Sequence, residues 1–376
     1  MDDSRTLGQL SGPARSALVV LLIYVFLVGV SSLETGIKIM GEDTQERLFS
    51  TVSNPLAALC VGVLGTVLVQ SSSASTSVIV GLVASGALGV GDAVPMVMGA
   101  NIGTTVTNTL VSLGHIRQSN EFRRAFAAAT VHDFFNVCAV ALLLPLELLF
   151  GVVSKPAEWL SGSLVGSAGS DWKSPVKAWV KEPVGWLKDL WGAIVENPNL
   201  RGVGMVLTGL VIVLVALAFI TRNMKKLVAD RVERSVNALL GRGGGALALL
   251  LGMTITFAVQ SSSITTSILI PLAGAGVVTL RNAYPVTLGA NVGTTITALL
   301  AALAASRPEA LTVALAHTTF NVLGILLLYV VPIARSLPLI GAERLADVAV
   351  ERRTLAVAYV AVVFIIVPLL GVVLLG

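Results

Sequence analysis

The chain has 376 residues, of which 55% are hydrophobic and only 12% are charged, and its mean hydropathy is +0.88. This composition excludes a soluble globular protein, because so few polar side chains cannot cover the surface of a chain of this length, and it predicts a membrane protein. The net charge is only +4 and the basic residues lie in short loops, which argues against a nucleic-acid partner and indicates the charge bias that orients membrane helices.

The first part of the chain predicts a membrane span, an acidic loop and a hairpin. Residues 14–31 form the span, and two apolar arms, 55–69 and 74–88, flank the next polar motif. Each arm is shorter than the roughly 20 residues that a spanning helix needs. We therefore expect a re-entrant hairpin over 55–88 with its tip in mid-membrane, rather than one long span with hydroxyls at its centre. The acidic loop, 32–53, contains Glu34, Glu42, Asp43 and Glu46 against Lys38 and Arg47.

Two further spans complete a first repeat over residues 1–153. The first, 95–113, is expected to be interrupted at Gly99–Gly103, where glycines allow a helix to unwind, and the second is 122–150. The next segment, 154–200, is rich in Ser, Gly, Pro and Lys and predicts no span. We expect it to form short amphipathic pieces that lie on the outer membrane surface, where tryptophans anchor them. A ligand-binding lobe is the alternative. The tryptophans are Trp159, Trp172, Trp179, Trp186 and Trp191.

The same order of elements then returns in a second repeat over residues 201–333. It comprises a span at 203–220, a hairpin over 245–278, and spans at 284–303 and 311–331. Residues 334–353 are expected to form a cytoplasmic loop and 354–375 an extra helix. The loop that corresponds to the acidic 32–53 is basic, and basic loops stay cytoplasmic, so we expect the two repeats to be inserted with opposite orientations. Its charges are Arg222, Lys225, Lys226, Arg231, Arg234 and Arg242 against Asp230 and Glu233.

Two polar motifs occur in both repeats at an offset of 190 residues. Gln70–Ser77 reads QSSSASTS and returns at Gln260–Ser267 as QSSSITTS, and Gly99–Thr107 returns at Gly289–Thr297. Polar clusters in a membrane cost free energy unless they hold a ligand, line water or bond to one another. Small and hydroxyl residues also pack helices together, but two copies of both motifs at one spacing favour the doubled polar centre of a transporter.

The hairpin tips offer groups for both an anion and a cation. Each tip has a Gln amide, three Ser hydroxyls and the unpaired N–H groups that begin the next helix. Hydroxyls and helix N-termini donate to anions, whereas hydroxyl, amide and backbone oxygens are ligands for a hard cation such as sodium. Neither centre contains Lys or Arg, so a bound anion needs a co-bound cation, and each lowers the desolvation cost of the other. The pattern therefore predicts cation-coupled symport.

A third motif, Val131–Asn136, reads VHDFFN and returns at Ala316–Asn321 as AHTTFN. Its carboxylate, Asp133, lies in an apolar span, and we interpret it as a cation ligand. A shallow position near the headgroups, or an ion pair with Arg123 or Arg124, is the alternative. For His132 and His317, a hydrogen bond to a neighbouring carbonyl is favoured over a proton-carrying role.

These motifs, with the run Glu121–Phe126 that leads into VHDFFN, resemble the type II sodium/phosphate cotransporters, which are found in bacteria and in animal epithelia. The resemblance covers about residues 50–150 and 245–375. It implies sodium-driven import of inorganic phosphate, with the two hairpins forming the binding centre. Asp at position 133 is the residue of the forms that move net charge, where the electroneutral form has Gly. The central loop lacks the cysteine pair of the animal proteins.

We therefore expect an all-α integral membrane protein with two inverted repeats and one extra C-terminal helix. Its expected function is electrogenic sodium–phosphate symport by alternating access across the plasma membrane, which is the inner membrane if the protein is bacterial. The residues assigned to phosphate are Gln70, Ser71, Ser72, Ser73, Gln260, Ser261, Ser262, Ser263, Asn101 and Asn291. Those assigned to sodium are Asp133, Thr104, Thr105, Thr294, Thr295, Ser75 and Thr265.

Two alternatives differ in substrate or in class. Hydroxyls and helix dipoles do not by themselves choose phosphate, so another oxyanion or a dicarboxylate is the alternative substrate. An intramembrane serine hydrolase would need a serine that a base activates. No histidine adjoins either serine-rich tip and no Gly-x-Ser-x-Gly elbow occurs, so we do not expect an enzyme.

Overall fold

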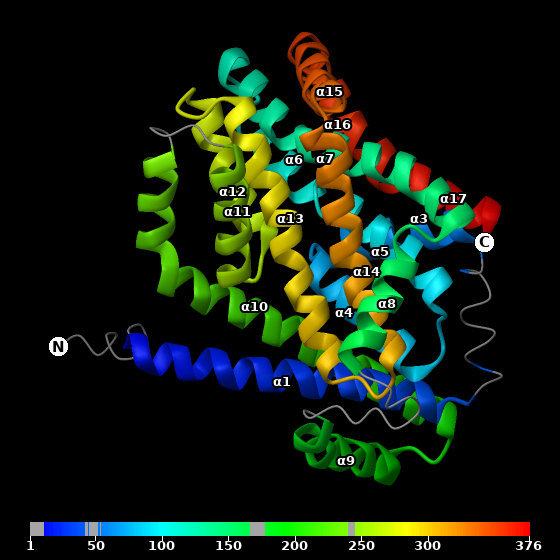
Figure 1. The fold of residues 1–376 in the computed structure, drawn as a ribbon. Helices are drawn as coiled ribbons and strands as arrows, with labels where there is room; N and C mark the ends of the chain where they lie inside the picture. The colour runs from blue at the N-terminus through cyan, green and yellow to red at the C-terminus, as the bar shows by residue number, and fades with distance from the viewer. Residues whose placement is uncertain (1–10, 42–43, 45–51, 53, 166–176, 240–244) are drawn as a thin grey trace.

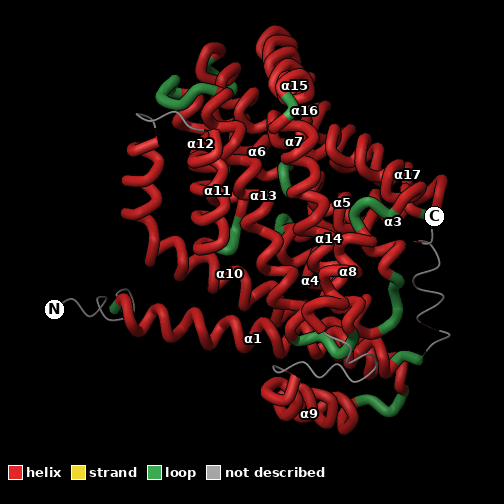
Figure 2. Tube along the Cα trace, in the orientation of Figure 1, coloured by secondary structure: helices red, strands yellow, loops and turns green. Residues whose placement is uncertain are grey.

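The computed structural model describes residues 11–41, 44, 52, 54–165, 177–239 and 245–376, without the side chains of 228–239. These residues form helices joined by turns, and they contain no strand (Figure 2). Within this part of the chain, six helices are long and apolar enough to cross a membrane. The structure thus confirms an all-helical, multi-pass membrane protein. The six are Gly12–Ile39, Ser119–Phe150, Pro198–Leu227, Leu280–Leu303, Pro308–Val330 and Arg353–Leu375.

The first helix of each repeat packs lengthwise against the other (Figure 1). These helices are α1 (Gly12–Ile39) and α10 (Pro198–Leu239). The basic loop expected after residue 220 is therefore wrong over 221–239, because α10 continues through it to Leu239. Glycines let the two backbones approach: a Cβ at Gly36 would lie 2.7 Å from the Val206 nitrogen, and one at Gly209 would lie 2.7 Å from the Gly29 oxygen. Small residues at a helix crossing are the usual means of close packing in membranes.

The expected acidic loop at 32–53 is wrong over its first part, because α1 continues to Ile39. Glu34 is only 4% exposed, and a buried carboxylate is retained only where it is paired. Its partners are Lys38, whose Nζ lies 2.7 Å from Oε1, and the backbone N–H of Ser306, 3.2 Å from Oε2. Glu42, Asp43, Glu46 and Arg47 lie outside the described residues.

Each repeat contains a pair of short helices joined by a tight turn. The first pair is α3 (Pro55–Val69) and α4 (Ser72–Ser85), and the second is α11 (Gly245–Val259) and α12 (Ser262–Gly274). These helices are 13–15 residues long, close to the lengths that the sequence predicts for the hairpin arms, although α4 begins at Ser72 rather than at residue 74.

The helix after each pair packs closely on the first arm. In the first repeat, α5 (Val90–Gly103) packs on α3, and in the second, α13 (Leu280–Leu303) packs on α11. A Cβ at Gly99 would lie 2.0 Å from the Leu59 oxygen, and one at the equivalent Gly289 would lie 1.9 Å from the Leu249 oxygen. The two repeats therefore share this packing in detail.

The span expected at 95–113 is interrupted, as the sequence predicts, but the break lies at a different place. It consists of α5, a break at Thr104–Thr105, α6 (Val106–Ser112) and a short 3-10 turn, η2 (Leu113–His115). The break follows the glycine motif instead of lying within it, and α13 is not broken. Close packing of Gly99 and Gly103 on the backbone of α3 explains why these glycines remain helical.

Each repeat ends in a long helix, and the helix that follows packs on the other repeat. The first repeat ends in α7 (Ser119–Phe150), and the second ends in α14 (Pro308–Ile325), which the π-helical η4 (Leu326–Val330) extends. The helices that follow are α8 (Ser154–Val165), which packs on α14, and α15 (Pro332–Glu351), which packs on α7.

The loop expected at 334–353 is therefore wrong, because α15 fills most of it. Small residues explain this packing: Ala342, Ala346 and Ala349 are fully buried, and a Cβ at Gly341 would lie 2.6 Å from the ring of Phe134. On the exposed side of α15, Asp347 accepts a hydrogen bond from Arg123, which holds the pKa of this carboxyl below its usual range.

The segment between the repeats contains α8 and α9 (Lys177–Ile194), and α9 lies beyond α1 at the edge of the molecule (Figure 1). Trp159, Trp179 and Trp186 are exposed on these helices, as expected for membrane-surface anchors. Trp191 instead donates to the Thr208 hydroxyl at 3.1 Å, and Trp172 lies outside the described residues.

The expected extra helix at 354–375 is present as three consecutive pieces. These are α16 (Arg353–Ala361), the π-helical η5 (Val362–Ile366) and α17 (Val367–Leu375), which packs on α3.

The second arm of each hairpin contacts the other repeat: α4 packs on α13 and α14, and α12 packs on α6 and α7. As a result of these contacts, the two hairpin turns lie close together inside the molecule.

Candidate functional site

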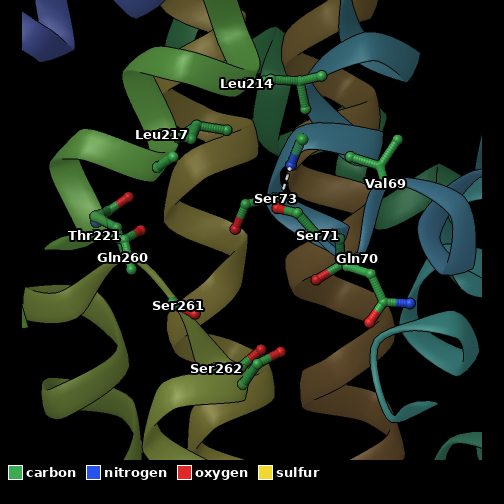
Figure 3. Close-up of a pocket in the computed structure, with 14 residues that line it drawn as sticks. Val69, Gln70, Ser71, Ser73, Leu214, Leu217, Thr221, Gln260, Ser261 and Ser262 are labelled. Atoms are coloured by element: carbon green, nitrogen blue, oxygen red, sulfur yellow. Dashed lines mark hydrogen bonds between the residues drawn. The ribbon is translucent and has the colours of Figure 1, made fainter. Parts of the chain in front are cut away.

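The two hairpin turns line a single cavity of 410 Å³ (Figure 3). They approach it from opposite sides, although 190 residues separate them in the sequence. Helix α10 forms a further wall of the cavity. The sequence did not predict this wall; its only polar residue there, Thr221, follows an apolar run and gave the only signal. The eight tip residues predicted from the sequence all line the cavity: Gln70, Ser71, Ser72, Ser73, Gln260, Ser261, Ser262 and Ser263. The residues of α10 are Leu214, Leu217, Ala218 and Thr221.

The glutamines form the turns. Gln70 and Gln260 have φ of 55° and 58°, in the left-handed region that residues with a side chain rarely adopt. The Gln70 amide donates to the Val67 carbonyl at 2.6 Å and accepts from the Thr107 hydroxyl at 3.0 Å. Gln260 makes the same two bonds, to the Phe257 carbonyl and the Thr297 hydroxyl. Each glutamine thus closes the end of one helix and ties the turn to its own repeat.

The serines of each tip divide into two roles. Ser71 and Ser261 cap the second helix of the pair, since each hydroxyl accepts from the backbone N–H three residues on, at 3.2 and 3.4 Å. The hydroxyls of the next two serines make no hydrogen bond to other described groups. Together with the free N–H groups of the first helical turn, they are available to a ligand in the cavity. These four are Ser72, Ser73, Ser262 and Ser263.

Among the described residues, no charged side chain lines the cavity. Helices α4 and α12 both begin at this cavity, and a helix N-terminus carries about half a positive charge. Hydroxyls and helix N-termini together form an anion-binding arrangement. They attract an anion without neutralising it, so a bound cation would add to its affinity.

Asn101 and Asn291, which the sequence assigns to phosphate, do not line this cavity. They belong to a buried network that crosses between the repeats. His317 contacts the Asn101 Oδ1 at 3.2 Å, and His132 reciprocally contacts the Asn291 Oδ1. Both histidines are fully buried and bonded to an amide oxygen, which agrees with the interpretation of buried, carbonyl-bonded histidines. Asn291 also donates to Asn136 at 2.8 Å.

Asp133 is 1% exposed, and its Oδ2 accepts two hydrogen bonds. The donors are the hydroxyls of Thr109, at 3.2 Å, and Tyr359, at 3.0 Å. No described group bonds to its Oδ1. The ion-pair alternative is wrong: Arg123 bonds to Asp347, and Arg124 donates to the Gly274 carbonyl. A buried carboxylate with one open oxygen and no cationic partner is chemically suited to a cation.

The six hydroxyls assigned to sodium all belong to buried residues. Each donates to a backbone carbonyl three or four residues earlier, at 2.8–3.3 Å, so its oxygen retains lone pairs for a cation. The Thr265 oxygen already accepts one hydrogen bond, from the Thr256 hydroxyl at 2.8 Å. In the described residues, no three His, Cys, Asp or Glu side chains gather as a metal site, so a cation here would depend on hydroxyl and carbonyl oxygens. The six are Ser75, Thr104, Thr105, Thr265, Thr294 and Thr295.

Asn108 links these regions, and sequence reasoning missed it. Its Oδ1 accepts from the Thr266 hydroxyl at 2.8 Å, and its Nδ2 lies 3.5 Å from His132 Nδ1. It therefore joins α6 to the second hairpin and to α7. The equivalent residue of the second repeat is Ala298, so the repeat pattern gave no signal for this contact.

The comparison with known proteins agrees with this geometry. The model of the Na+/Pi-cotransporter family matches residues 25–155 and 212–337, which include both hairpins. The chain belongs to this family.

Several curated relatives are similar over almost the whole chain. The chain is 33% identical to sodium-dependent phosphate transport protein 2B of Homo sapiens, over 95% of the chain and 65% of that protein. It is 34% identical to protein 2A of Ovis aries and 35% identical to protein 2A of Mus musculus, over 93% of the chain and 66% of each relative. The chain thus spans 65–66% of the length of these relatives. No solved structure matches.

Proposed function

We propose that this protein imports inorganic phosphate together with sodium. The observation that carries the proposal is the cavity where two serine-rich helix N-termini meet and which no basic side chain of the described residues lines. Four hydroxyls and two sets of backbone N–H groups surround a space suited to a small oxyanion. The names of the relatives, which are sodium-dependent phosphate transport proteins, support the same substrate and the same coupling ion.

Sodium supplies the charge that the cavity lacks. An anion and a cation that bind close together each lower the cost of desolvating the other, so each raises the affinity of the other. We assign one sodium to Asp133, whose Oδ1 is open, and further sodium contacts to the buried hydroxyls listed above. The carboxylate would compensate the charge of one additional sodium in the loaded site, so that this ion can bind. With three sodium ions and one divalent phosphate per cycle, transport would carry one net positive charge and would be electrogenic.

The contacts of each hairpin with the other repeat suggest how access to the cavity would alternate between the two sides of the membrane. Each second arm rests on the other repeat, so a movement of one repeat relative to the other would move a tip and open the cavity to one side. In this proposal the repeats are inverted in the plasma membrane and the paired short helices are re-entrant, because each arm has at most 15 residues.

Competition for uptake tests the substrate. The full-length protein would be reconstituted in proteoliposomes, and labelled phosphate uptake would be driven by an inward sodium gradient. Unlabelled phosphate should reduce this uptake, whereas equal concentrations of sulfate or a dicarboxylate should not. Stronger competition by sulfate or the dicarboxylate would instead establish the alternative substrate, another oxyanion or a dicarboxylate.

A further inference from the structure

The extra C-terminal helix reaches into the region of Asp133. Tyr359 lies on α16, outside both repeats, and its hydroxyl donates to Asp133 Oδ2 at 3.0 Å. Asp133 lies on α7, in the first repeat, 226 residues away. No duplicated motif contains Tyr359, so this contact is not part of the repeat pattern.

The ring of Tyr359 is held from two sides. It packs edge-on against Phe126 of α7, with ring centroids 6.5 Å apart, and against Phe364, with centroids 6.1 Å apart. Phe364 belongs to η5, the π-helical piece that follows α16, and such pieces often occur at functional sites. These contacts aim the hydroxyl at the carboxylate independently of the hydrogen bond itself.

Both hydrogen bonds to the carboxylate use the same oxygen. Thr109 and Tyr359 donate to Oδ2, and Oδ1 has no partner among the described residues although it is buried. Two donors on one oxygen stabilise the ionised carboxylate and prevent its rotation. They leave the other oxygen available in one orientation.

We propose that Tyr359 is a positioning residue that presents Asp133 Oδ1 to a transported sodium ion. This inference rests on the proposed sodium–phosphate symport. According to this inference, the extra helix, which belongs to neither repeat, affects the sodium dependence of transport through Tyr359. Loss of the hydroxyl would make the ionised carboxylate less stable and less well oriented, and would therefore weaken sodium binding while the phosphate cavity stays intact.

Tyr359→Phe tests this role, because it removes the hydroxyl and keeps the ring packing. In proteoliposomes, the sodium concentration that gives half-maximal phosphate uptake should rise at least about threefold, because Tyr359 bonds to the carboxylate and not to the ion, so that only part of the free energy of this hydrogen bond affects sodium binding. The maximal rate and the phosphate dependence at saturating sodium should stay within about twofold of wild type. Tyr24→Phe is the matched control, since the Tyr24 hydroxyl donates to the Trp179 carbonyl instead.

A second variant separates positioning from a general effect on the fold. In an Asp133→Gly background, adding Tyr359→Phe should leave the sodium dependence unchanged, because the group on which Tyr359 acts is absent. An unchanged sodium dependence of the single Tyr359→Phe variant, or an equal further change in the Asp133→Gly background, would refute the inference. Absence of sodium-driven phosphate uptake by the wild-type protein would instead refute the proposed function.

Discussion

Ser72 and Ser262 are the first residues of α4 and α12, and both line the same cavity from opposite repeats. Each hydroxyl is free of hydrogen bonds to other described groups, and each follows a serine that caps its helix. Both copies of the motif therefore place the same hydrogen-bond donors in the cavity, namely serine hydroxyls and the first N–H groups of a helix. This relationship leads to the first prediction.

Ser72→Ala or Ser262→Ala should weaken phosphate transport at least about tenfold without preventing folding. A hydrogen bond to a charged group contributes about 1.5–3 kcal/mol, and alanine leaves the helix N-terminus otherwise intact. The measurement is the phosphate dependence of sodium-driven uptake. Ser85→Ala is the control, because the Ser85 hydroxyl donates to the Leu82 carbonyl at the other end of α4. Wild-type uptake by both cavity variants would show that the tips do not bind phosphate.

Asp133→Gly should remove one sodium from the transport cycle. A neutral residue cannot compensate a desolvated cation, so the cation should no longer enter. With divalent phosphate, three sodium ions carry one net charge and two carry none, so phosphate-evoked current should disappear while uptake persists with a lower sodium Hill coefficient. A retained current with an unchanged ratio of charge to phosphate would mean that Asp133 is structural.

The opposite charge of the two equivalent segments, 32–53 and 222–242, predicts inverted repeats, although helices rather than loops form the start of the first and most of the second. A single cysteine introduced at Glu42 should react with an impermeant thiol reagent from outside the cell, and one at Arg231 only from inside. The native cysteines, Cys60 and Cys138, are free and would first be replaced by alanine. Reaction of both positions from the same side would exclude the inverted arrangement.

Gly99→Ala and Gly289→Ala should destabilise the protein in parallel. A Cβ at these positions would lie 2.0 and 1.9 Å from backbone oxygens of Leu59 and Leu249, which cannot move without displacing the first arm of the hairpin. Overpacking of this kind costs about 1–3 kcal/mol or more. Thermal unfolding in detergent measures the loss. Gly65→Ala is the control, because nothing lies within 4 Å of a Cβ there. Equal thermal stability of all three variants would contradict the close packing.

The hairpins and the cavity were the parts that the sequence predicted best. A polar octapeptide that occurs twice in an apolar chain has few structural uses, so its repetition indicated both the turns and the cavity that they share. The role of each residue within the motif could not be predicted, because it depends on local geometry. Gln70 and Ser71 form and cap the turn, and Ser72 and Ser73 remain available to a ligand.

The missed features depend on contacts between distant segments. Charged Glu34 suggested a loop, but Lys38 and the Ser306 backbone satisfy it inside the protein. Helix α15 reads as a loop because its buried face consists of small residues, whose packing on α7 gives a weak hydrophobic pattern. Tyr359 has no counterpart in the repeats, so only the tertiary structure shows that it contacts Asp133.

Coupling of phosphate to sodium is the central claim, and phosphate uptake into proteoliposomes under three imposed cation gradients tests it most directly. An inward sodium gradient should drive accumulation of labelled phosphate above equilibrium, because the described lining of the cavity has no basic side chain to neutralise the anion. Equal potassium or proton gradients should not. Accumulation driven equally well by potassium or protons, or phosphate entry that never exceeds equilibrium under a sodium gradient, would contradict the account.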